Sequence, residues 1–178
     1  RREKPIARSP EAIADCSSKL LWISKEIILV DPHFYPTEKR FTRPFSALMI
    51  QAFQHIEPTR IELHVKHSKV YGSEEQDQLR DWHDVCFARL PQFIPKGFRV
   101  KVIKWKQKDH GEKFHARYIM TEKGGFRYDV GLDAGHEGET TDVSILDQSL
   151  YEKRWKDHQK ETAAYDLADE IEIEGALV

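Results

Sequence analysis

The segment KFHARYIMTE, residues 113–122, places three basic side chains at alternate positions. A pleated strand points alternate side chains to one face, so Lys113, His115 and Arg117 are expected to lie together. An imidazole between two cations suits a phosphodiester, because histidine can act as nucleophile or general acid while the cations neutralise charge on the nonbridging oxygens. This chemistry needs no metal and no cofactor. A basic edge strand whose histidine packs locally is the alternative.

Charge is unevenly distributed along the chain. The formal net charge is −2, yet residues 99–117 hold seven Lys or Arg against two acids, and residues 161–178 hold six acids and no Lys or Arg. The basic run indicates either a site for phosphate or another polyanion, or a solvated strand face. The acidic segment predicts a terminal helix and solubilising extension. A tail that covers the basic strand is the alternative.

The composition is that of one soluble globular domain spanning residues 1–178. The chain is 39% hydrophobic and 33% charged, which separates it from disordered and membrane proteins. No apolar run approaches the roughly 18 residues that span a bilayer, and no signal peptide opens the chain, so we expect a cytoplasmic protein. Cys16 and Cys86 are expected to be buried free thiols. The opening RREKPI lacks a methionine, which suggests a fragment of a larger protein whose flanking domains are missing partners.

Apolar periodicity alternates between strands and helices. Short apolar runs predict six strands, at residues 25–31, 60–66, 98–105, 113–121, 126–131 and 141–146. Helical spacing predicts helices after Ser9, from Phe41 to Phe53, after Ser73 and in DQSLYEKRWKDHQKE. An order of βαβαβ, followed by a meander and a closing helix, predicts an α/β fold: a three-layer α/β/α sandwich with a mixed sheet.

Four segments together resemble one half of the phospholipase D superfamily. They are DPHF after an apolar strand, FHARYIMTE, VGLDAG and TTDVSILDQSLYEKRW, and they fall within residues 25–160. Members share an HxKxxxxD (HKD) motif, a Gly-Ser-x-Asn-like segment, an acidic position opening the next strand and a closing helix with a late Trp. The resemblance implies an α/β/α sandwich and a histidine that forms a phosphohistidine, while the histidine of a second motif protonates the leaving group without a metal. Substrates in the superfamily are phospholipids, DNA and RNA.

The catalytic motif is degenerate in this chain. His115 occupies the histidine position, but Arg117 replaces the lysine, Glu122 replaces the aspartate, and the Gly-Ser-x-Asn segment is reduced to Gly-Leu-Asp at 131–133. Arginine keeps the positive charge but presents a planar fork in place of a compact ammonium. The pattern resembles the pseudo-enzyme branch of the superfamily. That branch includes the C-terminal domains of MIT-domain proteins and is associated with binding of acidic phospholipid headgroups.

Two sets of residues form the expected site. The catalytic candidates, which the resemblance places around the phosphate, are His115, Arg117, Glu122 and Asp142. The ligand-binding candidates are Lys113, His33 and Asp133. We expect Glu122 or Asp142 to bond to His115 and fix its tautomer. His64 and His67 are expected to be surface groups, and a divalent-metal nuclease is not favoured because the chain lacks a Glu-x-Lys triplet.

Two classes of function are open. The first is a noncatalytic module whose phosphate pocket binds a nucleic acid backbone or anionic phospholipid headgroups. The second is a metal-independent phosphodiesterase acting through a phosphohistidine at His115, a nuclease in preference to a lipase because no amphipathic membrane segment is evident. Since one chain carries one motif, that enzyme needs a second copy, which a homodimer across a twofold axis can supply.

Overall fold

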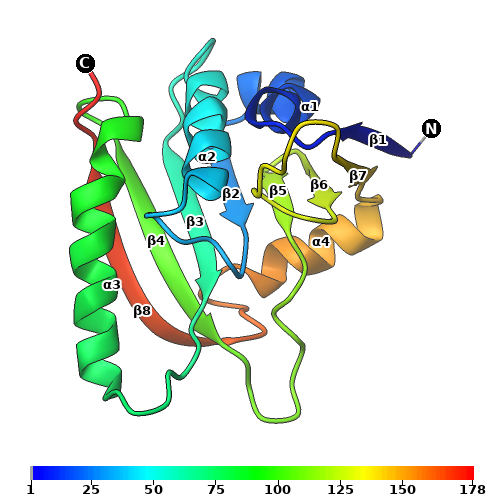
Figure 1. Cartoon of the computed structure of the whole chain (residues 1–178). Helices are drawn as coiled ribbons and strands as arrows, with labels where there is room; N and C mark the ends of the chain where they lie inside the picture. Colours follow the sequence, from blue (N-terminus) through cyan, green and yellow to red (C-terminus); the bar gives the residue numbers. More distant parts are fainter. Residues whose placement is uncertain (1) are drawn as a thin grey trace.

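Eight strands form one mixed sheet in the computed structural model, which describes residues 2–178 (Figure 1). Their order is β1-β7-β6-β5-β2-β3-β4-β8. The strands are β1 (Glu3–Ala7), β2 (Glu26–Val30), β3 (Arg60–Lys66), β4 (Arg99–Lys106), β5 (Tyr118–Thr121), β6 (Gly124–Tyr128), β7 (Thr140–Ile145) and β8 (Asp166–Glu174). The helices are α1 (Pro10–Trp22), α2 (Lys39–Ala52), α3 (Glu75–Arg89) and α4 (Gln148–Asp157), with a 3-10 turn at Pro91–Phe93. The expected mixed α/β class is confirmed, and all six predicted strands lie in the one sheet.

The centre of the sheet is parallel. β2 pairs with β3, and β3 with β4, so that Val30 lies opposite His64 and His64 opposite Ile103. Parallel neighbours need a crossover, which α2 and α3 provide. β5 joins the other side of β2 in antiparallel register, with Tyr118 opposite Val30. The C-terminal ends of β2, β3 and β4 and the beginning of β5 therefore lie together at one end of the central strands. We call this end of the sheet the carboxyl edge.

Helices cover both faces of the sheet (Figure 1). α1, α2 and α3 pack on one face around a core that includes Ile27 and Leu29 of β2. α4 packs on the other face, where Ile28, Val30 and Trp105 form a second core. Because both of its faces are covered, β2 is a continuous apolar run rather than an alternating one.

The acidic C-terminal segment is a strand, so the expected terminal helix is wrong. β8 pairs antiparallel with β4, and its acids meet bases: Glu174 lies 2.9 Å from Arg99, and Glu170 lies 3.2 Å from Lys101. The alternation of acidic and apolar residues in DEIEIE fits a strand with one buried face, and Ile173 is fully buried. The alternative, a tail that covers the basic strand, is confirmed.

The strand expected at 113–121 is shorter than the sequence indicated. β5 begins only at Tyr118, which pairs with Val30, the last residue of β2. Residues 113–117 extend beyond the end of β2 and therefore have no partner in that strand. The alternation of side chains persists in this unpaired stretch, since Phe114 is buried and His115 is exposed.

Both cysteines are free thiols. Cys86 is fully buried, and burial raises its pKa to about 12. Cys16 is half-buried on α1. Within residues 2–178 no helix is both long and apolar enough to cross a membrane.

Candidate anion-binding edge

Basic side chains gather at the carboxyl edge. They belong to the residues that end or follow β2, β3 and β4 and to the stretch that leads into β5: His33, Lys66, His67, Lys69, Lys106, Lys108, His110, Lys113, His115 and Arg117. Strand register brings these segments to one edge, which is where α/β sheets commonly bind ligands. At an inter-strand spacing of about 4.8 Å, the four strand ends from β5 to β4 cover about 14 Å.

Three lysines line a cavity of about 560 Å³ at the ends of β3 and β4, which we call the lysine cavity. Lys66 and Lys69 have no ion pair among residues 2–178, whereas Lys106 pairs with a glutamate of α3. Asp109 and Asp166 also line the cavity. An ammonium without a carboxylate partner keeps its full attraction for a phosphate oxygen, so Lys66 and Lys69 are the cations best placed to bind an anion here.

His67 forms part of the wall of the lysine cavity and is almost fully buried. Its Nε2 lies 3.2 Å from Oε1 of Glu75 without hydrogen-bond geometry, and its Nδ1 has no partner in the described part of the chain. Burial, reinforced by Lys104 and Lys106, lowers the pKa of His67 and favours the neutral imidazole. The ring of His67 is therefore a neutral part of the cavity wall, and its buried nitrogens are not exposed to the cavity.

Several acids near this edge are already neutralised. Glu112 lies 2.8 Å from Arg154 of α4. Asp133, a ligand-binding candidate, lies 3.0 Å from Arg8 and 3.4 Å from Arg40, so its carboxylate is occupied by cations of the protein itself. The lysines of the edge that lack an ion pair among the described residues are Lys66, Lys69, Lys108 and Lys113, and the acids of the lysine cavity that lack one are Asp109 and Asp166. Within the lysine cavity the two unpaired lysines are therefore matched by two unpaired acids, while Lys108 and Lys113 add positive charge along the rest of the edge.

Asp31, directly after β2, ties three segments of the edge together. Its Oδ1 accepts a hydrogen bond from the amide of His33 at 2.9 Å, and its Oδ2 accepts one from the amide of Leu132 at 2.8 Å. Burial raises the pKa of Asp31, while these hydrogen bonds and the charges of Arg117 and His33 oppose the rise. A buried carboxylate held by two amides beside a guanidinium is an anchor, and it positions Arg117 and the turn at 131–133.

Gly131 allows that close approach. Its φ of 67° lies in the left-handed region that glycine adopts without strain. A Cβ at this position would lie 2.5 Å from Oδ2 of Asp31 and 2.6 Å from Cγ of Arg117. The reduced Gly-Leu-Asp segment therefore keeps the one residue that the packing requires.

The same turn is fixed from the side of α2. Pro44 lies inside that helix and has no N–H, which leaves the carbonyl of Arg40 without its usual helical partner. The amide of Ala134 donates to that carbonyl at 2.7 Å. A helix defect thus holds the loop after β6 against α2.

His115 and Lys113 project into solvent at the edge. Both side chains are exposed, and neither has a hydrogen bond or ion pair within residues 2–178. Arg117 is half-buried: its Nη1 donates to a backbone carbonyl of the β6–β7 loop at 2.7 Å, and its buried Nε has no partner in the part of the chain that the structure describes. The intervening Phe114 and Ala116 pack into the core under α4, which leaves Lys113 and His115 outside that core.

Glu122 and Asp142 do not bond to His115, so the expected hydrogen bond that fixes its tautomer is absent from the described residues. Glu122 follows the far end of β5, seven residues and about 23 Å of extended chain from His115. There its two oxygens accept hydrogen bonds from the amides of Lys25 at 2.8 Å and Glu26 at 3.0 Å. Asp142 is exposed in β7, next to the outermost strand β1. The structure places Arg117 beside Asp31 and Gly131 and leaves His115 exposed, and it does not bring either candidate carboxylate into a hydrogen bond with His115.

Two histidines expected at the surface are buried instead. His67 lies on the α3 side of the sheet, and His64 lies under α4. Nε1 of Trp105 donates to Nδ1 of His64 at 2.8 Å, and Nε2 of His64 lies 2.9 Å from Glu62, which also pairs with Arg60 at 2.8 Å. Within residues 2–178 no group of three or more His, Cys, Asp or Glu side chains is arranged to hold a metal ion.

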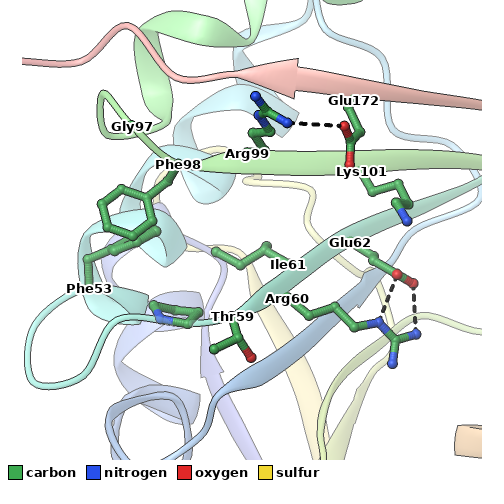
Figure 2. Close-up of a pocket in the computed structure, with 11 residues that line it drawn as sticks. Phe53, Thr59, Arg60, Ile61, Glu62, Gly97, Phe98, Arg99, Lys101 and Glu172 are labelled. Carbon is green, nitrogen blue, oxygen red and sulfur yellow. Dashed lines mark hydrogen bonds and ion pairs between the residues drawn. The ribbon is translucent and has the colours of Figure 1, made fainter.

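A cavity of about 370 Å³ lies at the opposite edge of the sheet, at the beginnings of β3 and β4 (Figure 2). It also contains basic residues, namely Arg60, Arg99 and Lys101, but each is paired with an acid of β3 or β8. Figure 2 shows the pairs from Arg60 to Glu62 and from Arg99 to Glu172. Neutralised cations attract an added anion weakly, so the lysine cavity is the better candidate site.

No protein-family model matches this sequence, and no curated protein matches it. Among solved structures, one that matches is TrmBL2, an archaeal chromatin protein described as showing a novel mode of DNA binding. The match has a TM-score of 0.39 and 11% sequence identity, and it covers 92% of this chain and 54% of that chain. A likeness at this level carries no inference about the ligand or the activity of this chain.

Proposed function

We propose that this chain is a phospholipase D-like domain, a three-layer α/β/α sandwich with a degenerate active site, that binds phosphate-containing ligands at its carboxyl edge. The observation that carries the proposal is the lysine cavity, in which Lys66 and Lys69 have no ion pair among the described residues. The ligands are a nucleic acid backbone or anionic phospholipid headgroups, because both present phosphate oxygens to such cations.

Contacts between the motifs support the proposal. Asp31 of DPHF accepts a hydrogen bond from the amide of Leu132 in VGLDAG. Arg117 of FHARYIMTE lies beside Gly131 of the same turn. Three of the four segments that carry the resemblance therefore meet at one point of the fold, as a site assembled from separate motifs requires.

Binding fits the geometry better than turnover. A histidine nucleophile needs a partner that fixes its tautomer and a second group that protonates the leaving oxygen. His115 has no hydrogen-bond partner within residues 2–178, and the carboxylate of Glu122 is engaged at the other end of β5. Lys113 and the exposed imidazole can still contact an anion without either partner.

The proposal is tested by measuring the affinity for labelled single-stranded DNA, single-stranded RNA and vesicles with anionic headgroups, in EDTA and across a range of salt concentrations. The variant is Lys66→Gln/Lys69→Gln/Lys113→Gln, which removes three exposed or half-exposed cations of the edge. If each lysine contacts one phosphate, the slope of log affinity against log salt for a single strand should fall by about 2.

A control of equal charge removes three lysines that are exposed, have no ion pair among the described residues and lie away from the carboxyl edge: Lys19→Gln/Lys96→Gln/Lys123→Gln. It should leave affinity within about twofold, since long-range charge contributes little above the Debye length. Equal losses in the two triple variants, or binding that salt does not weaken, would contradict the proposal.

A metal-independent phosphodiesterase acting through His115 is the second candidate. The observation that favours it is the exposed His115, which has no hydrogen-bond partner within residues 2–178 and precedes Arg117 by two residues. One chain holds one motif, so activity requires a homodimer whose two His115 side chains face a shared cleft. The test is cleavage of DNA and RNA oligonucleotides in EDTA, abolished by His115→Ala in a folded protein. Absence of cleavage by the wild type rejects this candidate and leaves the binding proposal intact.

A further inference from the structure

A second, smaller cavity adjoins the lysine cavity. It measures about 230 Å³ and is lined by residues of the β2–α2 loop, the β3–α3 loop, α3 and β4, among them Tyr35, Ser68, Val70, Gln78, Trp82 and Lys104. We call it the aromatic cavity. Ser68 lines both cavities, so the two are neighbours in the fold.

Tyr35 contributes an exposed aromatic ring to the aromatic cavity. Its side chain is 42% exposed, and its ring centroid lies 5.9 Å from that of Trp82, which is buried beneath it. Packing against Trp82 holds the tyrosine ring, and the exposed part is available to a planar ligand. A ring that is already ordered loses little conformational entropy when another ring stacks on it.

Polar groups without partners surround this ring. Nζ of Lys104 lies 4.2 Å from the ring centroid of Trp82 and has no ion pair in the described part of the chain. Nε1 of Trp82 is itself buried and has no hydrogen-bond partner among the described residues. Gln78 donates its side-chain N–H to the carbonyl of Val70 at 3.0 Å, which leaves its amide oxygen free. The ammonium of Lys104 and the amide oxygen of Gln78 therefore offer the cavity a donor and an acceptor, which is what the edge of a nucleobase requires.

We propose that the carboxyl edge binds single-stranded nucleic acid, with the phosphate backbone in the lysine cavity and a base stacked on Tyr35 in the aromatic cavity. This inference rests on the proposed function and names its ligand class. A phospholipid headgroup supplies phosphate but no planar aromatic ring, and a duplex keeps the faces of its bases stacked inside. Single strands are bound by a basic groove combined with aromatic platforms, because every base has a π-face. The carboxyl edge, about 14 Å across, is long enough to contact two or more consecutive phosphates of a strand.

The test compares three labelled probes of equal length and charge: oligo-dT, oligo-rU and an abasic DNA strand that has the backbone without bases. Tyr35→Ala should weaken binding of oligo-dT and oligo-rU by about 5- to 150-fold, which is the range of one base–aromatic stack. Binding of the abasic strand should stay within twofold of the wild type. Tyr35→Phe keeps the ring and should bind all three probes as the wild type does.

The outcomes separate this inference from the proposed function. Lys66→Gln/Lys69→Gln should weaken the binding of all three probes to a similar extent, because these lysines contact the phosphate backbone that the probes share. If Tyr35→Ala, folded by thermal melting, leaves oligo-dT and oligo-rU unaffected or weakens the abasic strand equally, the base site is overturned while phosphate binding stands. Tighter binding of phosphatidylserine vesicles than of any strand assigns the edge to lipid and overturns it as well. If the wild type binds neither the strands nor the vesicles at low salt, the proposed function itself fails.

Discussion

Trp105 donates a hydrogen bond from Nε1 to Nδ1 of His64 at 2.8 Å. An indole N–H is only a donor, so the proton of the neutral imidazole must lie on Nε2, where Glu62 accepts it at 2.9 Å. His158, whose ring centroid lies 5.5 Å from that of His64, is buried beside it. Its Nδ1 donates to the carbonyl of Arg154 at 2.7 Å, and its Nε2 has no partner among the described residues. Two neutral histidines therefore lie in the core under α4.

These histidines should make the fold sensitive to acid. Burial lowers the pKa of His64, and it lowers that of His158 to about 3. The unfolded histidines take up protons below about pH 6.5 while the folded ones stay neutral, so stability is fully present above that pH and is lost between about pH 6.5 and 3. The slope should reach about 1.4 kcal/mol per pH unit for each histidine. Urea unfolding at several pH values measures it.

His158→Phe provides the control for this pH dependence. The variant keeps an aromatic ring among the aromatic side chains around His158 and removes one titrating group. The loss of its hydrogen bond to Arg154 should lower stability by about 1 kcal/mol at neutral pH. Below pH 6.5 the slope of unfolding free energy against pH should fall by as much as the contribution of one histidine, about 1.4 kcal/mol per pH unit. An unchanged slope would show that His158 is not one of the groups responsible.

The central strands could be predicted from sequence because their environment leaves a strong signature. β2 is apolar on both faces and is covered by helices on both, so its run EIILV stands out. β8 was missed because its acidic composition suggested a solvated helix, although DEIEIE alternates with a period of two. β1 carries no such pattern: it is a largely exposed edge strand, fixed by its pairing with β7.

The candidate site could be predicted only where its residues are close together in the sequence. The alternation of a buried Phe114 with an exposed Lys113 and His115 follows the period of two in the sequence, which needs no tertiary information. The lysine cavity and Tyr35 depend on the paths of three loops that sequence patterns do not specify. Glu122 was placed beside His115 by its position in a motif, but seven extended residues carry it to the other end of β5.

Gly131→Ala should be markedly more destabilising than Gly138→Ala. Both glycines have positive φ, 67° and 88°, so both variants carry the backbone cost of about 1 kcal/mol. Only at Gly131 would the new Cβ collide with Asp31 and Arg117, whereas nothing lies within 4 Å at Gly138. We expect a total loss of about 2 to 4 kcal/mol for Gly131→Ala in urea unfolding. Equal losses in the two variants would mean that the turn at 131–133 can move away from Asp31.

Asp31→Ala should destabilise the protein by about 2 to 4 kcal/mol, because it leaves two amides unbonded and the guanidinium of Arg117 without its neighbouring carboxylate. Asp31→Asn keeps one acceptor oxygen and should cost less. Chemical denaturation measures both. If Asn is as harmful as Ala, the negative charge beside Arg117 matters more than the hydrogen bonds to His33 and Leu132.

Glu122→Ala should lower stability without weakening ligand binding. The carboxylate accepts hydrogen bonds from the amides of Lys25 and Glu26, so its removal leaves two backbone donors at the start of β2 without their partner and should cost about 1 to 3 kcal/mol. The affinity of the folded variant for single-stranded DNA should stay within twofold of the wild type, because this carboxylate lies at the edge opposite the lysine cavity. Glu11→Ala, at an exposed acid of α1, should change stability by less than about 0.5 kcal/mol and serves as the control. A Glu122→Ala protein of normal stability that no longer binds DNA would instead place Glu122 in the ligand site, as its position in the motif suggests.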